Sequence, residues 1–305
     1  MKKKITNPIF HELVKLKIIK KKNLIKLSNK TRDKKIPVYQ DKQSKVIFLG
    51  QYKTSNNYYK AVKYEDNDTI SNKNNRFSKV KIQKKNIKLK LIEDDKRRFL
   101  QFKSLLNNRK VLDFGCGWGG FLKFIDKAKL LTGVELRDEC IFFIRKNIKK
   151  ILIKNNLNNI KDKYDVITMF HVLEHVPYQV KILKELKSKL SKNGKIIIEV
   201  PNAQDFLLWF DDLKDFKKFT FWSEHLVLHT ENSLRKILKT SGFKRIKIEY
   251  YQRYNFNNHL GWFIKQKPGG HDFYKDTFDD KINKNYVDFL KRIKKTDTLI
   301  AIASN

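Results

Sequence analysis

A short apolar segment that ends in closely spaced glycines is the feature that most constrains the fold of this chain. It reads VLDFGCGWGGFL over residues 111–122. The first apolar residues predict a buried strand that ends near Asp113, and those after the glycines predict the start of a helix. Glycine permits positive φ and close approach of the backbone to a ligand, and a helix N-terminus presents free N–H groups. Such a unit indicates an open α/β sheet with a ligand at the carboxyl ends of its strands.

The glycines alone do not identify that ligand. Gly115, Gly117 and Gly120 satisfy the G-x-G-x-x-G spacing of dinucleotide-binding proteins. Asp113, however, precedes the first glycine by two residues, and its carboxylate would repel a pyrophosphate. The same carboxylate suits a ligand with an ammonium group, such as S-adenosylmethionine. Glu135, at the end of the next expected strand, suits the ribose hydroxyls of either ligand, so a nicotinamide cofactor stays open as an alternative.

Strand-like and helix-like segments alternate from residue 93 to residue 305. This alternation predicts an α/β fold with a Rossmann-like, seven-stranded, mostly parallel sheet and helices on both faces. The last strand follows a long insertion at 252–297. We expect strands at 110–114, 130–135, 150–153, 164–169, 195–200, 244–251 and 298–303, and helices at 119–127, 138–149, 178–190 and 231–241.

The first 92 residues have a different pattern and carry no recognisable chemical motif. A basic amphipathic stretch from Phe10 to Leu27 is followed by strand-like runs at 36–40, 45–52 and 57–64. We expect residues 1–92 to form a small α+β cap or docking region. Residues 93–305 would then form the α/β domain, with the insertion as a substrate lid.

The net charge of +36 raises the question of a nucleic-acid partner. Only 11 of the 68 basic residues are arginine, which binds phosphates and bases better than lysine does. The abundance of lysine, isoleucine and asparagine, all with A/T-rich codons, favours a solvated lysine-rich surface instead. Nucleic acid is therefore the less favoured partner.

Other classes of protein are disfavoured by simple features. No segment is apolar enough to span a membrane, and no secretory signal is recognised, so a cytoplasmic location is expected. Cys116 and Cys140 are too few for a disulfide framework or a structural zinc site. The oligomeric state is not predicted.

Four segments together carry a family resemblance: VLDFGCGWGGFL, GVEL, YDVITMFHVLEHV and GKIIIEVPN. Their order resembles the successive motifs of class I S-adenosylmethionine-dependent methyltransferases. The resemblance implies S-adenosylmethionine as cofactor and an antiparallel seventh strand between the fifth and sixth. No acid follows ILI at 151–153, where many relatives contact adenine; Asn155 or Asn156 stands there instead. The cofactor-binding residues that the resemblance implies are Asp113, Gly115, Cys116, Gly117, Gly119, Glu135, Leu136, Phe170 and His171.

Histidines cluster in the segments that carry the resemblance. Methyl transfer to an alcohol requires removal of a proton, and histidine suits this near neutral pH. Our first candidate for the general base is His225, followed by His229, Glu224 and His175. A purely structural role for His175 is an equal alternative. The i, i+4 spacing of His171 and His175 resembles metal-ligand spacing, but no third ligand is evident and no metal is predicted.

Two later segments, at 221–243 and 250–271, resemble methyltransferases associated with surface-polysaccharide and nucleotide-sugar modification. The expected reaction is methylation of a sugar in a nucleotide-linked or surface-glycan precursor, on oxygen. Arg253, Tyr254 and His271 are predicted to bind this substrate, Arg253 as a bidentate clamp on a diphosphate. The alternatives are an RNA or protein methyltransferase and a non-catalytic scaffold that binds the cofactor.

Overall fold

The structure is a computed structural model that describes residues 5–52, 79–83, 86–90, 93–275 and 277–305. Side chains are described from residue 93 onward, except at 271 and 276, and over residues 5–52. The strand expected at 57–64 lies outside the described residues. Among the helices that are described, none combines the length and the apolar character needed to cross a bilayer.

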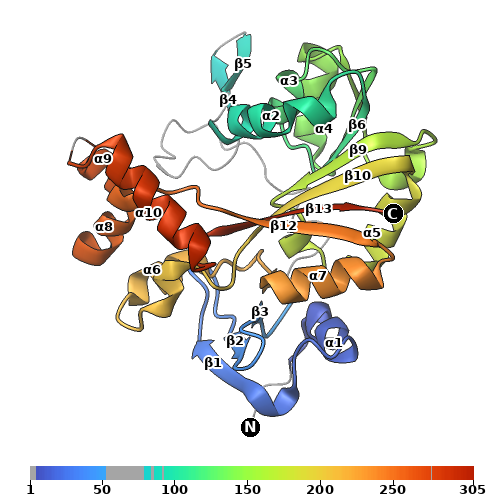
Figure 1. The fold of residues 1–305 in the computed structure, drawn as a ribbon. Helices are drawn as coiled ribbons and strands as arrows, with labels where there is room; N and C mark the ends of the chain where they lie inside the picture. Colours follow the sequence, from blue (N-terminus) through green and yellow to red (C-terminus); the bar gives the residue numbers. More distant parts are fainter. Residues whose placement is uncertain (1–4, 53–78, 84–85, 91–92, 276) are drawn as a thin grey trace. The chain divides into compact units, whose positions relative to one another are not determined.

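The largest sheet has the seven strands that the sequence predicts (Figure 1). Its order is β12-β13-β10-β9-β6-β7-β8, so the last strand lies between the fifth and sixth, as expected. Strand β6 pairs in parallel with β7 and β9, and β7 pairs in parallel with β8. The strands are β6 (Lys110–Phe114), β7 (Leu130–Val134), β8 (Ile151–Lys154), β9 (Tyr164–Phe170), β10 (Leu190–Pro201), β12 (Arg245–Tyr251) and β13 (Thr298–Ser304). The predicted fold class is confirmed.

The helices of the α/β region form where the sequence predicts them, except that one of them ends earlier than expected. They are α2 (Glu93–Leu106), α3 (Gly120–Lys123), α4 (Asp138–Asn147), α5 (Gln179–Ser188) and α7 (Glu231–Thr240). The helix expected at 119–127 is only one turn long. The amides of Phe124 and Ile125 bond to carbonyls three residues earlier rather than four, so the helix tightens and ends there.

The backbone packs as two compact parts that are interleaved along the chain. The first part takes in residues up to 53, 171–183 and 198–302, and the second takes in 54–170, 184–197 and 303–305. These parts do not test the expected boundary at residue 92, which stays a prediction. In the second part, β4 (Lys79–Gln83) and β5 (Asn86–Lys90) form a separate two-stranded antiparallel sheet.

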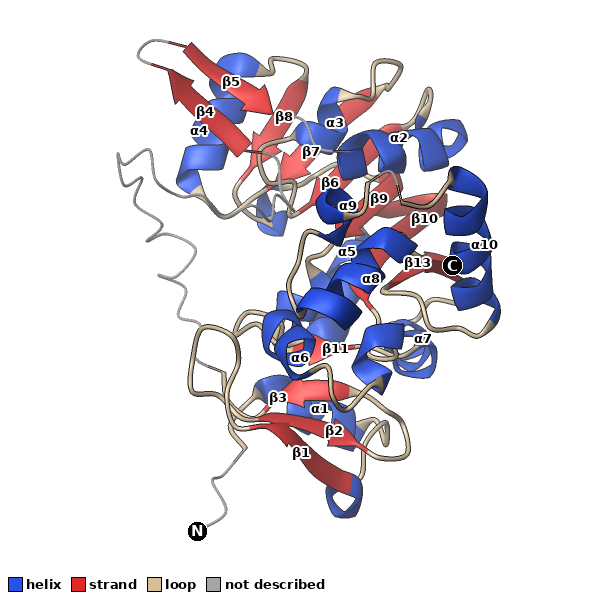
Figure 2. Cartoon of the chain, turned by 90° about the vertical axis from the view of Figure 1, so that its left-hand side faces the viewer, coloured by secondary structure: helices blue, strands red, loops and turns tan. Residues whose placement is uncertain are grey.

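The N-terminal residues form a small sheet with a strand from much later in the chain. Helix α1 (Pro8–Lys15) precedes β1 (Leu24–Ser28), β2 (Val38–Asp41) and β3 (Ile47–Leu49). Strand β11 (Val227–Leu228) completes the order β1-β2-β3-β11. Figure 2 shows α1 beside this sheet, where Phe10 stacks on Phe48. The amphipathic stretch expected at 10–27 is therefore helical only to Lys15, because the chain turns at Lys17 (φ 54°) and then enters β1.

The insertion at 252–297 is mostly helical in the residues that the structure describes. It forms α8 (Phe256–Lys265), α9 (Gly270–Phe273) and α10 (Asp280–Arg292). Before it, α6 (Lys214–Thr220) packs on α8 through Phe216 and Trp262, whose ring centroids lie 5.1 Å apart. The structure does not test whether these helices act as a lid.

Candidate functional site

The glycine turn after β6 adopts the conformation that its sequence predicts. Gly115, Gly117 and Gly119 have φ values of 79°, 55° and 77°. Other residues adopt this left-handed region only at an energetic cost. At Gly119, which caps α3, a Cβ atom would also lie 3.3 Å from side-chain atoms of Ile144 and Ile151. Backbone strain and packing therefore both require glycine in this turn.

Asp113 is a buried acid at the end of β6. Its side chain is 4% exposed, and Thr168 Oγ1 donates a 2.7 Å hydrogen bond to its Oδ1. Burial raises the pKa of Asp113 to about 7, against the opposing effects of the Thr168 bond and the charge of Arg98. The carboxyl group therefore changes charge near neutral pH, and its ionised form would be stabilised by a bound cation.

Glu135 joins the glycine turn to the end of β7. Its Oε2 accepts a 2.8 Å bond from the amide of Gly117, and its Oε1 accepts bonds of 2.9 and 3.1 Å from the amides of Leu136 and Arg137. The guanidinium of Arg137 adds two contacts of 3.3 Å. Sequence reasoning missed Arg137, although a cation two residues after a strand-end acid is a signal that could have identified it.

Cys116 fills the space beneath the turn. A Cβ atom at Gly133 would lie 2.6 Å from Cys116 Sγ, so thiol and strand are in close contact. Burial raises the pKa of the Cys116 thiol well above its usual value. A buried thiol that resists ionisation is a poor nucleophile. The position suits a small packing residue in the turn.

Apolar side chains border the same turn. Phe170, at the end of β9, packs against Phe102 and Phe121, and the guanidinium of Arg98 lies 4.8 Å from its ring centroid. Leu136 is 57% exposed, directly after Glu135. A buried carboxylate, a left-handed glycine cradle, a strand-end acid and an exposed leucine fit a ligand that has a cationic end, a ribose and an aromatic base.

A second group of polar residues lies in the first compact part, around His171. This residue has φ 53°, and its ring is held between two fully buried carboxylates. Nδ1 lies 3.2 Å from Glu174 Oε1, and Nε2 lies 3.1 Å from Glu199 Oε1. Nη1 of Arg253 lies 3.4 Å from the same Nε2. The structure thus brings together His171 and Arg253, which were predicted for the cofactor and the substrate respectively.

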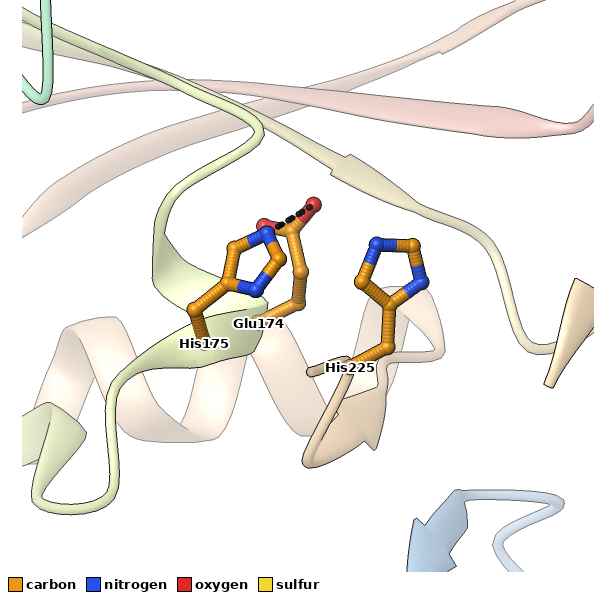
Figure 3. Close-up of side chains that lie close together, drawn as sticks. All are labelled: Glu174, His175 and His225. Atoms are coloured by element: carbon orange, nitrogen blue, oxygen red, sulfur yellow. Dashed lines mark ion pairs between the residues drawn. The ribbon is translucent and has the colours of Figure 1, made fainter. Parts of the chain in front are cut away.

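Glu174, His175 and His225 form a group that we call the Glu–His cluster (Figure 3). Nδ1 of His175 lies 2.9 Å from the backbone carbonyl oxygen of Glu224. A carbonyl oxygen only accepts, so Nδ1 carries a hydrogen, and in the neutral ring Nε2 has the lone pair. That Nε2 lies 4.0 Å from Glu174 Oε1, and the rings of His175 and His225 are centred 5.0 Å apart.

The charge of Glu174 is set by its neighbours. Burial raises the pKa of this carboxyl group, but the hydrogen bond from His171 and the charges of His175 and His171 outweigh burial and lower it. Glu174 is therefore a buried carboxylate that stays ionised at neutral pH.

N-terminal residues hold the segment that carries His225. The amide of Leu226 donates to the carbonyl oxygen of Glu174 at 2.9 Å. The carbonyl oxygen of Leu226 accepts from the amide of Leu49 at 3.1 Å and from Nδ2 of Asn7 at 3.0 Å. Sequence reasoning gave the N-terminal region no chemical role, because the contacts of Asn7 and Leu49 with Leu226 join residues more than 170 positions apart in the chain.

The remaining predicted residues lie in different environments. His229 is fully buried, with Nε2 2.9 Å from Gln179 Oε1 and Nδ1 3.0 Å from Ser233 Oγ. Burial lowers the pKa of His229 to about 4. Glu224 is also buried, beside His225 in sequence. The side chain of His271, in α9, lies outside the described residues.

The turn at Arg253 and Tyr254 is fixed by a partly buried acid, Asp297. The backbone amides of both residues donate to the carboxyl group of Asp297, at 3.0 to 3.2 Å. Gln252 accepts from the amide of Asp297, and its Nε2 lies 3.1 Å from His259 Nε2. Burial lowers the pKa of His259 to about 3, so this ring is neutral. The network fixes the backbone that carries the Arg253 side chain.

Comparison with known proteins finds methyltransferases. The chain is 30% identical over 159 residues to the mitochondrial ubiquinone biosynthesis O-methyltransferase of Candida albicans, which is 46% of this chain and 44% of the relative. It is 32% identical over 124 residues to the tRNA U34 carboxymethyltransferase of Campylobacter fetus, which is 36% of this chain and 44% of the relative. The chain thus spans less than half the length of these curated relatives. A SAM dependent methyltransferase from Archaeoglobus fulgidus is a structural neighbour, with 19% identity, a TM-score of 0.47 and coverage of 70% and 94% of the two chains.

A family model gives the assignment. Residues 84–248 match the model described as a methyltransferase domain, and this span includes the glycine turn, Glu135 and the Glu–His cluster. It confirms the predicted class of enzyme and its methyl donor, S-adenosylmethionine. Because the matched residues make up more than half of the 305, the chain belongs to the methyltransferase domain family.

Proposed function

We propose that this protein transfers the methyl group of S-adenosylmethionine to a hydroxyl oxygen, and that the Glu–His cluster activates the hydroxyl. The observation that carries the proposal is the imidazole of His175. Its Nδ1 is committed to a backbone carbonyl, its Nε2 lone pair is free, and a buried ionised carboxylate and a second imidazole lie beside it. Such a group can accept the proton that an alcohol loses on methylation.

The residues around the glycine turn would hold the donor. Asp113 would bind its ammonium group, the amides of the turn would approach its methionine end, and Glu135 would accept hydrogen bonds from its ribose. Leu136 and Phe170 offer apolar surface to its base, and His171 follows Phe170 directly. When bound, the donor supplies a methyl group on a sulfonium sulfur, and this group moves to the acceptor oxygen as the C–S bond breaks and the C–O bond forms.

His225 and His175 are the residues that we propose for proton removal. Both rings are partly exposed, so an acceptor can reach them. His229 has both ring nitrogens within hydrogen-bond distance of core side chains, and its low pKa disfavours proton uptake. We therefore propose a packing role for His229. For Glu224 we propose that its backbone carbonyl contributes to the site, because it accepts the hydrogen bond from His175.

The acceptor that we propose is a sugar hydroxyl of a nucleotide-linked or surface-glycan precursor. The support is the resemblance carried by residues 221–243 and 250–271. Arg253 would bind the diphosphate or another anionic group, with Tyr254 and His271 as further contacts. The location that we propose is cytoplasmic.

A second candidate acceptor comes from the curated relatives. Several of them are named as O-methyltransferases of ubiquinone biosynthesis, so an intermediate of that kind would also present an oxygen to the cluster. The relative named as a tRNA U34 carboxymethyltransferase, together with the charge of +36, gives RNA as a further candidate.

The test uses S-adenosylmethionine with a labelled methyl group and the full chain. It is incubated separately with nucleotide sugars, ubiquinone-biosynthesis intermediates bearing free hydroxyls, and total tRNA. We expect label in a sugar fraction as a base-stable ether. Label only in a ubiquinone intermediate would move the acceptor class, and label only in RNA would overturn the small-molecule assignment. Binding of the donor without transfer to any acceptor would favour a non-catalytic scaffold.

A further inference from the structure

We propose that Glu174, His175 and His225 form a binding site for one divalent transition-metal ion of the Zn²⁺ class. Each residue offers one donor atom, and the three donor atoms lie within 4.8 Å of one another. Two imidazole nitrogens with one carboxylate oxygen is a donor set that binds such ions through three protein ligands and leaves a coordination position open. Figure 3 shows the carboxyl group of Glu174 between the two rings in that view.

An unsatisfied oxygen points to the same ligand. Glu174 is fully buried, and its Oε2 has no hydrogen-bond partner among the residues that the structure describes. Its Oε1 is already engaged by Nδ1 of His171 at 3.2 Å. A buried carboxylate oxygen without a partner costs free energy. A cation bound by both oxygens of Glu174, beside the two imidazoles, would satisfy it.

The hydrogen bond of His175 prepares its ring for coordination. Nδ1 donates to the carbonyl oxygen of Glu224, so in the neutral ring Nε2, on the side of Glu174, is the nitrogen with the lone pair that a metal requires. Metal-bound histidines in proteins nearly always donate their other N–H to a carbonyl or carboxylate, which fixes the tautomer and the orientation of the ring. His175 already has this arrangement.

The backbone holds the third ligand close to the other two. The bond from the amide of Leu226 to the carbonyl oxygen of Glu174 ties the residue after His225 to the first ligand. Bonds of about 2.0–2.2 Å around a tetrahedral ion place donor atoms roughly 3.3–3.6 Å apart. Side-chain rotations that move the donor atoms by about an ångström would therefore bring the three atoms to that distance. Only His175 and Glu174 could be recognised from sequence as neighbours, since His225 lies 50 residues further on.

Metal binding would also bear on catalysis: as ligands, the two imidazoles would not take up the proton themselves, so this part of the inference replaces that step and rests only on the proposed methyl transfer to a hydroxyl. With the imidazoles acting as ligands, the open position would take the acceptor hydroxyl and lower its pKa. The O–H bond would then break with loss of the proton to water, before the oxygen accepts the methyl group. The binding claim itself does not depend on the reaction.

The experiment measures Zn²⁺ binding to the full chain without a histidine tag. Protein stripped with a chelator is titrated with Zn²⁺ by calorimetry, and metal content is counted after dialysis. Trp222 provides an optical signal, because its ring centroid lies 5.3 Å from that of His225 and 6.0 Å from that of His175. We expect one tight equivalent in the wild type.

Variants decide whether that equivalent is bound at this site. Loss of an outer-shell partner alone typically weakens metal binding 10–100-fold, so His225→Ala and Glu174→Gln should each weaken it by more than about 100-fold. His11→Ala, an exposed histidine on α1, is the matched control and should bind as the wild type does. Circular dichroism checks that each variant is folded; if Glu174→Gln does not fold, the surface-accessible His225→Ala still tests the site.

The results separate this inference from the proposed function. Binding that survives His225→Ala, or no tight equivalent in the wild type, would overturn the metal site. Methyl transfer to an alcohol that is insensitive to chelation, without Zn²⁺ binding, would do the same and leave the proposed function standing. A tight equivalent that is lost in His225→Ala, with no transfer to any hydroxyl, would keep the metal site and remove the proposed function.

Discussion

The glycine turn and the Glu–His cluster are assembled in different ways. The residues that hydrogen-bond to the carboxyl groups of Asp113 and Glu135 lie within residues 113–137, apart from Thr168, and the parallel register of β6 with β7 brings them together. The cluster combines residues 174 and 175 with residue 225, and residues 7 and 49 hold the third member in place. The first region should therefore tolerate changes in distant parts of the chain, whereas the second should be sensitive to them.

The largest effect is expected from removing the imidazole of His225, which belongs to the cluster that long-range contacts assemble. His225→Ala should lower kcat by about 10²–10⁴-fold, because general-base assistance is worth that much. Affinity for S-adenosylmethionine, measured by calorimetry, should stay within about twofold. His11→Ala serves as the control. Full turnover in His225→Ala would remove this residue from the chemistry.

The second-largest effect is expected at the glycine turn, whose residues are close together in sequence. Asp113→Ala should weaken binding of S-adenosylmethionine by about 100-fold or more, since loss of one partner of a buried ion pair costs roughly 3 kcal/mol or more. Asp113→Asn keeps the shape and removes the charge, so a similar loss in both variants would assign the effect to charge. Unchanged affinity in calorimetry would show that this acid lies outside the donor site.

Asp113 also predicts a pH dependence. Its pKa of about 7 means that the carboxyl group is neutral below this pH, so affinity for the cationic donor should fall by about tenfold per pH unit below 7 and level off above it. The folded pKa exceeds the ordinary 3.8, so this group stabilises the fold most below 3.8, and the contribution is lost as pH rises toward 7. Calorimetric titrations at several pH values test this, and Asp113→Asn should abolish the slope. A flat profile in the wild type would contradict it.

A smaller effect should connect the N-terminal sheet to the cluster. Asn7→Ala removes the bonds from Nδ2 to the carbonyl oxygens of Leu49 and Leu226 and the bond by which Oδ1 caps the amide of Ile9 in α1, at a cost of about 1–3 kcal/mol. We expect a lower melting temperature and a several-fold lower kcat without a change in donor affinity. Asn23→Ala, near the surface of the same region, is the control. Equal losses in kcat and in affinity for S-adenosylmethionine would show that this change affects the glycine turn as well as the Glu–His cluster, so that the two are not independent.

Much of the fold could be predicted because its signals are local. All seven expected strands form, since most of them contain a short apolar run between polar turns and β12 alternates polar and apolar residues. Thr230 caps α7 just where that expected helix begins, with Ser233 completing the capping box. The end of α3 was predicted wrongly, because the amides of Phe124 and Ile125 bond to carbonyls three residues earlier and the helix does not continue to residue 127.

The candidate site also divides into residues that local sequence signals identified and residues that they did not. Asp113, the glycines and Glu135 were identified from sequence because strand ends and left-handed turns need particular residue types at fixed spacing. The Glu–His cluster could not be recognised from sequence as one group. The spacing of His171 and His175 suggested a shared helical face, whereas Glu174 and His175 lie in a short 3-10 helix and meet His225 instead.

The sequence by itself determined the parallel sheet, the glycine turn and the acid beside it, since short-range sterics and hydrophobic periodicity act between neighbours in the chain. Only the tertiary structure decided which histidines meet the buried carboxylate of Glu174. That choice depends on hydrogen bonds between the N-terminal sheet, the turn after β9 and the segment around residue 225, and the spacing of residues along a chain does not encode contacts over such distances.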